Sequence, residues 1–181
     1  MRSLTGVTDE FASQVPDSGG VRMVPAFSGL FAPHWRSDAR GVIVGLTSYS
    51  TKHHIARAAL ESVAYQTADV VQAMESDSGR PLTRLRVDGG LAKSSLLLQT
   101  QADLLNIDVE RPRDTETTAR GCAIAAGLAL GLWRLVGDHV DGSHMLDSHV
   151  FKSSISAEER ATRVKEWKKA IDRSLDWVER E

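Results

Sequence analysis

The stretch Arg86-Val87-Asp88-Gly89-Gly90 closes an apolar-rich run that includes Leu82 and Leu85. A helix-like segment follows it and opens at Ala92-Lys93-Ser94-Ser95. Paired glycines between a strand and a helix remove side chains where the backbone must approach another group closely, and the N–H groups at the start of the helix favour an anion. The stretch therefore predicts a site for a nucleotide phosphate, with the Asp88 carboxylate beside it. Asp-Gly-Gly is equally ordinary turn chemistry, so a plain turn is the alternative.

Segments with the apolar spacing of strands alternate along the chain with segments that have the spacing of helices. The predicted strands span residues 21–26, 41–46, 84–88 and 107–110. The predicted helices run from Ser50 or Thr51 to Ser78, over 94–105, from Thr117 or Thr118 to about 131, and from Ser156 onward. Residues 1–20, 27–41 and 137–150 lack either spacing and are predicted to be loops or linkers. Alternation of this kind indicates an α/β domain.

Apolar spacing also predicts which face of each helix is buried. In the helix that ends at Ser78, the predicted face consists of Ile55, Ala59, Val63, Val70 and Met74, widened by Leu60, Ala64 and Val71. In the last helix it consists of Val164, Trp167, Ile171, Leu175 and Val178. The segment 117–131 is instead rich in glycine and alanine. Because so many glycines weaken a helix unless close packing compensates, we expect another element to pack tightly against it.

The composition is that of an ordinary globular domain. The chain has 181 residues, of which 41% are hydrophobic and 25% are charged, enough to bury a core within one domain. A formal net charge of −2 gives no electrostatic reason to expect nucleic acid or an anionic membrane surface as a partner, and no apolar run is long enough to span a bilayer. Cys122 is the only cysteine, so no internal disulfide can form, which fits a cytoplasmic location. We expect Cys122 to be a small buried hydrophobic residue.

Further motifs surround the glycine stretch in a fixed order. Upstream lie Val24-Pro25-Ala26-Phe27-Ser28-Gly29-Leu30-Phe31-Ala32-Pro33-His34-Trp35 and Ala39-Arg40-Gly41. Downstream lie Val109-Glu110-Arg111-Pro112 and Glu116-Thr117-Thr118-Ala119-Arg120-Gly121-Cys122-Ala123. This ordered set resembles the C-terminal half of the FGGY family of carbohydrate kinases, and within that family it is most similar to the glycerol kinases. The resemblance runs from about Val24 to the final helix.

The resemblance implies an actin-like ATPase domain of the ribonuclease H-like class, with a mixed sheet flanked by helices. Residues 1–20 would be an N-terminal remnant or linker, and residues 21–181 the nucleotide-side domain. ATP or ADP is then the expected ligand of this chain. Mg2+ and glycerol are expected only together with a domain N-terminal to it, which in the family carries the catalytic base and the first phosphate loop. The chain is therefore not expected to phosphorylate glycerol alone, and a homo-oligomer is its expected assembly.

The site residues that the resemblance implies are Gly89 and Gly90 at the ATP phosphates and Ser94 at the adenosine. Family members commonly carry asparagines where this chain has Ser94 and Ser95, and serine lacks the paired donor and acceptor of an amide. A helix cap is therefore the alternative role for Ser94. Asp88 would act through its charge near the nucleotide or its metal, with a turn-forming role as the alternative. No residue of the chain is implied as catalytic or as a metal ligand.

The loop at residues 27–41 carries two further expectations. The guanidinium of Arg40 is expected to organise the loop through several hydrogen bonds, with proximity to the substrate as the alternative. Apolar side chains of the loop are expected to form an exposed wall that promotes association; they are Phe27, Leu30, Phe31 and Trp35.

Two classes of function follow. The first is the ATP-binding half of an ATP-dependent kinase that converts glycerol and ATP to glycerol 3-phosphate and ADP, or half of another FGGY sugar kinase. The second is a non-catalytic module that binds nucleotide or pairs with a kinase. The residues by themselves leave both open.

Overall fold

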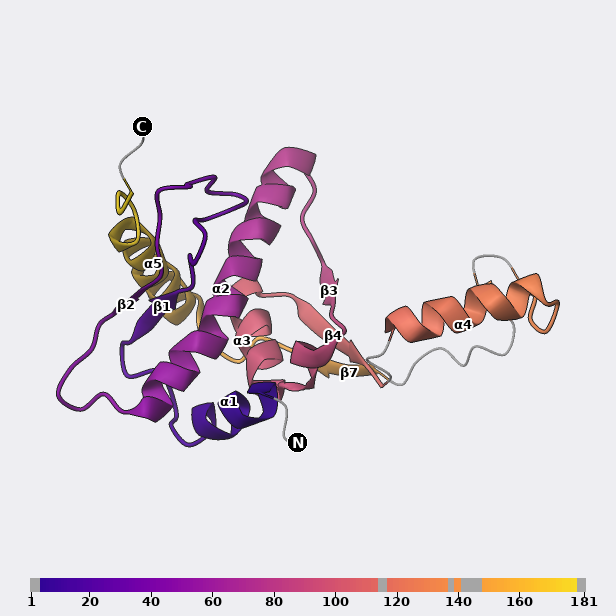
Figure 1. Ribbon diagram of the computed structural model, residues 1–181, viewed down its shortest axis with the longest axis horizontal. Coiled ribbons are helices and arrows are strands. Elements are labelled where there is room, and N and C mark those ends of the chain that lie inside the picture. The colour runs from indigo at the N-terminus through magenta and orange to yellow at the C-terminus, as the bar shows by residue number, and fades with distance from the viewer. Residues whose placement is uncertain (1–3, 114–116, 137–138, 141–147, 179–181) are drawn as a thin grey trace.

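The computed structural model describes residues 4–113, 117–136, 139–140 and 148–178. Its elements follow the chain in the order α1 (Leu4–Ala12), β1 (Arg22–Val24), β2 (Val42–Val44), α2 (Lys52–Ser78), β3 (Arg84–Arg86), the 3-10 helix η1 (Gly90–Lys93), α3 (Ser95–Leu105), β4 (Asp108–Pro112), α4 (Thr117–Ala129), β5 (Leu135–Val136), β6 (His139–Val140), β7 (Ser148–Phe151) and α5 (Ala157–Arg173). The predicted alternation of strands and helices is confirmed. The long helix α2 runs through the centre of the molecule, with α5, β1 and β2 on one side and β3, β4 and β7 on the other (Figure 1).

The strands form small sheets that lie beside the helices. β1 and β2 are antiparallel, with Met23 opposite Ile43. β3, β4 and β7 form a mixed sheet with β4 in the middle, because β3 is parallel to β4 while β7 is antiparallel to it. Parallel neighbours need a crossover connection, and α3 supplies it between β3 and β4. The Asp88-Gly89-Gly90 stretch therefore lies between the end of β3 and the start of that crossover.

Local capping residues set the ends of the helices. Thr51 precedes α2 and its N–H donates to His54 Nδ1 at 3.1 Å. At the other end, α2 stops at Gly79, whose φ of 64° is left-handed. Ser156 Oγ accepts the Glu159 N–H at 3.1 Å and so caps α5. The predicted starts of α2 and α5 and the predicted end of α2 are confirmed.

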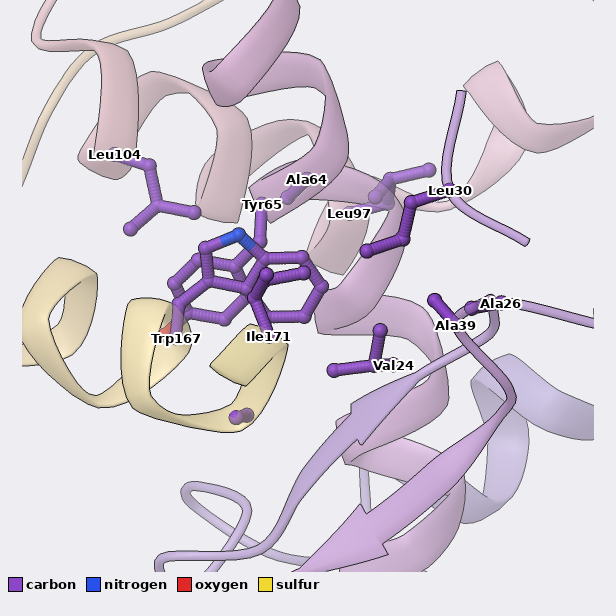
Figure 2. Close-up of a cluster of buried hydrophobic side chains, with 11 residues drawn as sticks. Val24, Ala26, Leu30, Ala39, Ala64, Tyr65, Leu97, Leu104, Trp167 and Ile171 are labelled. Atoms are coloured by element: carbon purple, nitrogen blue, oxygen red, sulfur yellow. The ribbon is translucent and has the colours of Figure 1, made fainter. Parts of the chain in front are cut away.

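The main core lies where α2, α3, α5 and the β1–β2 pair meet (Figure 2). At its centre the rings of Tyr65 and Trp167 stack 5.0 Å apart at an angle of 10°, and burial raises the pKa of the Tyr65 hydroxyl to about 12. The other buried members are Val24, Ala26, Leu30, Ala39, Ala64, Leu97, Leu104, Ala170 and Ile171. A second cluster, formed by Leu98, Ala102, Val109 and Phe151, joins α3 to the mixed sheet.

The buried face of α2 is rotated from the predicted one. Leu60, Ala64 and Val71 are buried as predicted, but Val70 is 38% exposed and Met74 is 59% exposed, so the prediction is wrong for the last two. The reason is that α2 packs against α1, α3 and β1 together. Three neighbours bury more than one face of a helix, so a single apolar stripe in the sequence does not predict which residues of α2 are buried. In the last helix the predicted burial of Trp167 and Ile171 is confirmed, whereas Val178 lies beyond α5 and is 40% exposed.

The α1 helix forms where the sequence predicted no regular element. It packs against the N-terminal part of α2, with the Phe11 ring 5.4 Å from the His53 ring and Lys52 Nζ 5.0 Å from the Phe11 ring. A helix of 9 residues is too short to be stable alone in water. Contacts with α2, rather than local periodicity, therefore account for α1. The division of the chain at residue 20 stays a prediction.

The α4 helix departs furthest from its prediction. It begins at Thr117, as predicted, but it extends away from the rest of the molecule (Figure 1). Cys122 is exposed, and just beyond the helix Leu130 and Leu132 are 75% and 73% exposed. The predictions of a tightly packed helix and of a buried Cys122 are therefore wrong for this structure. Small side chains permit close packing, but a neighbouring element has to supply it.

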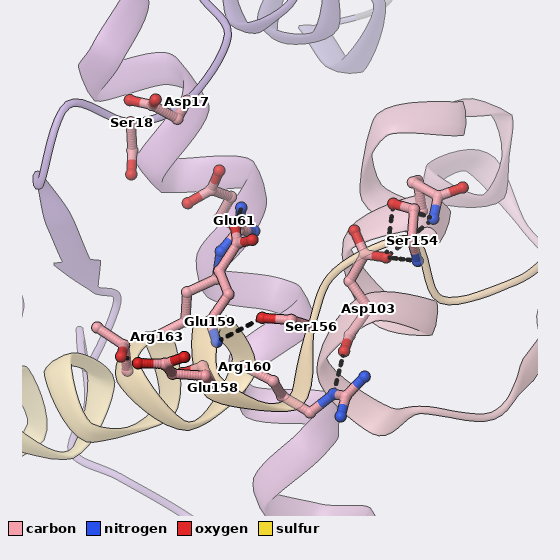
Figure 3. Close-up of polar contacts among 12 residues, drawn as sticks. Asp17, Ser18, Glu61, Asp103, Ser154, Ser156, Glu158, Glu159, Arg160 and Arg163 are labelled. Atoms are coloured by element: carbon pink, nitrogen blue, oxygen red, sulfur yellow. Dashed lines mark hydrogen bonds and ion pairs between the residues drawn. The ribbon is translucent and has the colours of Figure 1, made fainter.

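The segment from β7 into α5 is anchored on α3 by Asp103 (Figure 3). The Asp103 carboxylate accepts the Ser154 N–H at 2.7 Å, and the Asp103 backbone carbonyl accepts the Nε–H of Arg160 at 2.6 Å. The prediction of a loop over 137–150 is wrong at both described parts of that range: residues 139–140 form β6 and pair with β5, and residues 148–150 belong to β7 and pair with β4. Residues 137–138 and 141–147 lie outside the described residues.

Candidate functional site

The turn from β3 into α3 leaves its backbone open to approach. Gly89 has a φ of 82°, in the left-handed region that favours glycine. Apart from its chain neighbours, a Cβ placed on Gly89 or on Gly90 would meet no atom of the described residues within 4 Å. A ligand can therefore reach the main chain at this turn without displacing the described protein atoms.

The strand β4 holds the turn on both sides of the two glycines. Before them, the Val87 N–H donates to the Glu110 carbonyl at 2.9 Å. After them, Arg111 Nη1 donates to three acceptors, which are the Ala92 carbonyl at 3.3 Å, the Lys93 carbonyl at 3.3 Å and Ser95 Oγ at 3.2 Å. Two consecutive residues of β4 thus fix the two ends of an open glycine turn.

Ser94 is built into the start of α3. Its Oγ accepts the Leu97 N–H at 3.1 Å, which is the bond of a helix N-cap. The same hydroxyl donates to Asp9 Oδ1 on α1, and Ser94 is only 7% exposed. The structure thus contains the cap that was the alternative role of Ser94. Its contact with adenosine stays a prediction.

Charged residues surround the turn. Asp88 is exposed directly before the glycines, and Arg86 and Lys93 are exposed on either side of them. Among the described residues, no group of three or more His, Cys, Asp or Glu side chains could hold a metal ion.

The loop at residues 27–41 forms a second feature, separate from the glycine turn. Residues 25–34 of this region and the middle of α2 enclose a cavity of about 450 Å³ that shares no residue with the turn. Phe27, Phe31 and Trp35 are 74%, 69% and 72% exposed, while Leu30 is buried in the core. The prediction of an exposed apolar wall is confirmed for three of its four side chains and is wrong for Leu30, because that side chain packs between β1 and α3 in the core cluster.

Arg40 organises this loop, as predicted. Its guanidinium Nη1 donates to the Ser37 carbonyl at 3.0 Å and to the Ala39 carbonyl at 2.7 Å. Its backbone N–H donates to the Ser174 carbonyl at 2.9 Å, just after α5. Arg40 therefore joins the loop to the C-terminal segment.

Asp38 makes a second junction between the same two segments. Its carboxylate accepts two hydrogen bonds from Arg36, at 2.7 and 2.6 Å, and one from the Asp176 N–H at 2.7 Å. The Arg36 guanidinium and then these N–H contacts hold the pKa of Asp38 well below its ordinary value. Nearby, the Asp69 carboxylate of α2 accepts the indole N–H of Trp167 at 2.8 Å and lies 2.9 Å from His34 Nε2. These contacts join the 27–41 loop to α2 and to the segment after α5, so the loop is part of the packed structure.

Comparison with known proteins identifies the family to which this fold belongs. The C-terminal domain of the FGGY family of carbohydrate kinases matches residues 6–130. The chain belongs to this family. The glycerol kinase of Renibacterium salmoninarum is 52% identical over 171 residues, which cover 94% of this chain and 34% of that protein. The glycerol kinase of Methylorubrum populi is 52% identical over 179 residues, which cover 97% of this chain and 35% of that protein. The chain thus spans about a third of the length of these curated relatives.

Solved structures agree with the family. The crystal structure of Plasmodium falciparum glycerol kinase with ADP matches with a TM-score of 0.79 and 35% identity, covering 96% of this chain and 34% of that one. A xylulose kinase from Rhodospirillum rubrum matches with a TM-score of 0.69 at 24% identity, covering 92% of this chain and 33% of that one, which shows the fold alone. The predicted actin-like fold class and the resemblance to glycerol kinases are confirmed. Within the described part of the chain, no helix is long and apolar enough to cross a membrane.

Two residues at the glycine turn were not identifiable from sequence patterns. Asp9 lies in a segment without periodicity, 85 residues before its partner Ser94. Arg111 belongs to a motif that indicates the family, but its place beside the turn follows from the pairing of Arg86 with Glu110 across β3 and β4. A prediction that these two strands pair in parallel would have indicated it.

Proposed function

We propose that this chain forms the nucleotide-binding side of an ATP-dependent kinase that phosphorylates glycerol, with Gly89 and Gly90 at the phosphates. The observation that carries the proposal is the open glycine turn, found in a chain that is 52% identical to a glycerol kinase over 94% of its length. The ADP bound by the Plasmodium falciparum relative supports a nucleotide as the ligand.

The chemistry of the turn suits a phosphate. Phosphoryl transfer depends on positioning and on stabilising negative charge rather than on covalent participation by the protein. Main-chain N–H groups at Gly89 and Gly90 can donate to phosphate oxygens, while Arg86 and Lys93 add positive charge nearby. Asp88 is the carboxylate that would face a nucleotide-bound Mg2+, and Ser94 lies on the side proposed for adenosine. Glycerol as the acceptor, Mg2+ as the metal, a cytoplasmic location and homo-oligomeric assembly belong to the same proposal and rest on the family.

Titration with Mg·ADP, followed by amide chemical shifts, tests the nucleotide site. Shifts are expected to be largest over residues 88–95, with an affinity on the order of millimolar. Gly90→Asp places a carboxylate against the phosphates and is expected to weaken binding by at least about tenfold. The substitution is compatible with the fold, because a Cβ at Gly90 meets open space and the φ of this residue is not left-handed.

Thr83→Asp is the matched control. Thr83 is exposed and precedes β3 at the end opposite the glycines, so the same carboxylate is introduced away from the proposed phosphate site. This variant is expected to bind ADP like the wild type. Shifts that avoid residues 88–95, or equal weakening by both variants, would contradict the site.

A chimera separates the kinase from a non-catalytic module. The N-terminal two thirds of the Renibacterium salmoninarum glycerol kinase would be joined to this chain in place of its own matching third. Glycerol-dependent ADP production is expected, and it is expected to be lost with Gly90→Asp but kept with Thr83→Asp. A folded chimera that binds ADP without turning over glycerol would support the non-catalytic module instead.

A further inference from the structure

Arg111 is the only side chain of β4 that the described hydrogen bonds connect to the far side of the glycine turn. It lies in the central strand of the mixed sheet, next to Glu110. Glu110 holds the incoming end of the turn through the Val87 N–H at 2.9 Å. Arg111 holds the outgoing end through the Ala92 and Lys93 carbonyls. The two ends of the turn are therefore hydrogen-bonded to neighbouring residues of one strand.

The acceptors that Arg111 uses need an outside donor. The last carbonyls of a helix have no partner within it, and Ala92 and Lys93 end η1. The first N–H groups of α3 do not reach back to them: the Leu97 N–H goes to Ser94 Oγ and the Leu98 N–H to the Ser94 carbonyl. All three acceptors are bonded by one nitrogen, Nη1, at the far end of the guanidinium, and the ammonium nitrogen of a lysine would lie one bond nearer the main chain.

Arg111 is itself held in place. Its guanidinium carbon lies 5.3 Å from the centre of the Phe151 ring, and Phe151 is 6% exposed in the second core cluster. The His149 ring packs edge-on against Phe151 with the centroids 4.5 Å apart. A cation over a buried aromatic ring is stabilised by the ring's negative face. The donor is thus fixed relative to the sheet before any ligand binds.

We propose that Arg111 is a positioning residue for the nucleotide phosphates: it sets the direction of the main-chain N–H groups after Gly89 by bonding the η1 carbonyls, and it does not itself contact the phosphate. The proposal rests on the proposed function, because it assigns the phosphates to this turn. Preorganised donors bind an anion more tightly than mobile ones, since less ordering is left to occur on binding.

Arg111→Met and Arg111→Lys test the role. Methionine keeps an apolar stem over Phe151 but removes every donor, while lysine keeps the charge on a side chain that is one bond too short to replace Nη1. In the ligand-free protein, both are expected to speed hydrogen exchange at residues 90–94 by about tenfold or more, with exchange in α5 unchanged. Both are also expected to raise the dissociation constant for Mg·ADP by about tenfold, the equivalent of losing one or two hydrogen bonds. Arg113→Met is the control, because Arg113 is exposed just after β4.

The exchange and affinity measurements test the anchoring of the turn and the positioning of the phosphates separately. Unchanged exchange at residues 90–94 in both variants would overturn the anchoring by Arg111. Faster exchange with an unchanged ADP affinity would overturn the positioning role alone. Full ADP affinity in Arg111→Lys together with a loss in Arg111→Met would show that charge suffices, which also overturns it. If the wild-type protein shows no ADP shifts at residues 88–95, the proposed function fails and the phosphate-positioning role fails with it, while the exchange data still show whether Arg111 anchors the turn.

Discussion

The packed region around α2 and the protruding helix α4 are stabilised in different ways. Around α2, side chains of α2, α3, α5 and β1 meet, and the stacked rings of Tyr65 and Trp167 lie at the centre. In α4, most of the described side chains face solvent, and the helix extends away from the other helices and strands (Figure 1). Both regions were expected to be packed. The difference shows that helical spacing or small residues indicate the capacity to pack, while partners decide whether packing occurs.

The largest expected effect on the free energy of unfolding comes from a substitution in the packed region around α2. Trp167→Ala removes a side chain that is 1% exposed and is expected to lower the free energy of unfolding by about 3–5 kcal/mol. Leu132→Ala, at a residue that is 73% exposed just after α4, is expected to change it by less than about 0.5 kcal/mol. Urea unfolding of both variants provides the measurement. Similar losses for the two would mean that the α4 region is packed in solution.

A smaller loss is expected from Asp38→Asn, which weakens the junction between the 27–41 loop and the C-terminal segment. Because the folded pKa of Asp38 lies below the ordinary value of about 4, its ionised form stabilises the protein above that pH and this contribution is lost as the pH falls through the folded value. The wild-type free energy of unfolding should therefore decline below about pH 4, and the decline should be shallower in the variant.

Asp77→Asn serves as the control for that experiment, because Asp77 is exposed near the end of α2. It should leave both the stability at neutral pH and the acid decline close to those of the wild type. A decline that is equally steep with and without Asp38 would refute the assignment of the depressed pKa to this junction.

We expect molecules of this protein to associate through the 27–41 loop rather than through the α4 region. Exposed Phe31 and Trp35 form an apolar surface of the kind that promotes contact between molecules. We expect concentration-dependent oligomers in sedimentation velocity, and Phe31→Ser together with Trp35→Ser should raise the dissociation constant by about tenfold or more. Leu132→Ser tests the other region. If it weakens association more than the double variant does, the segment just after α4 is the contact surface, and a clean monomer from micromolar to near-millimolar concentration would contradict both.

The smallest effect is expected within α4. Gly121 lies in the helix with open space around a built Cβ, so Gly121→Ala should stabilise α4 by about 0.5–1 kcal/mol, visible as slower hydrogen exchange of its amides. At Gly127 the same Cβ would overlap the Trp133 ring, so Gly127→Ala should displace that ring and shift its indole resonance. Slower exchange in Gly127→Ala without a shift of Trp133 would mean that this ring does not pack on the helix.

Much of the fold was predictable because its signals are local. Thr51, Ser156 and Gly79 mark helix ends through bonds to residues within four positions, and the glycine turn needs a left-handed φ at Gly89. The motif order also indicated the family that the C-terminal domain match confirms. The candidate site was predictable to the same extent, because the two glycines lie next to each other in the chain.

The rest depended on residues far apart in the sequence. Asp9, the partner of Ser94 on α1, is 85 residues away from it in the sequence, and Arg111 on β4 is 18 residues away from Lys93 in the turn. No periodicity encodes such pairs. The exposed face of α2, the burial of Leu30 and the isolation of α4 likewise depend on which elements become neighbours.

By itself, the sequence determined the strands and helices with clear apolar spacing, the caps, the open glycine turn and the family. Only the tertiary structure decided that Asp9 bonds to Ser94, that Arg111 anchors the turn, and that α4 has no tight partner among the described elements. The physical reason is the range of the interactions. Backbone conformation and capping are settled over a few residues, whereas burial and the sharing of hydrogen bonds are settled by the segments that meet in space.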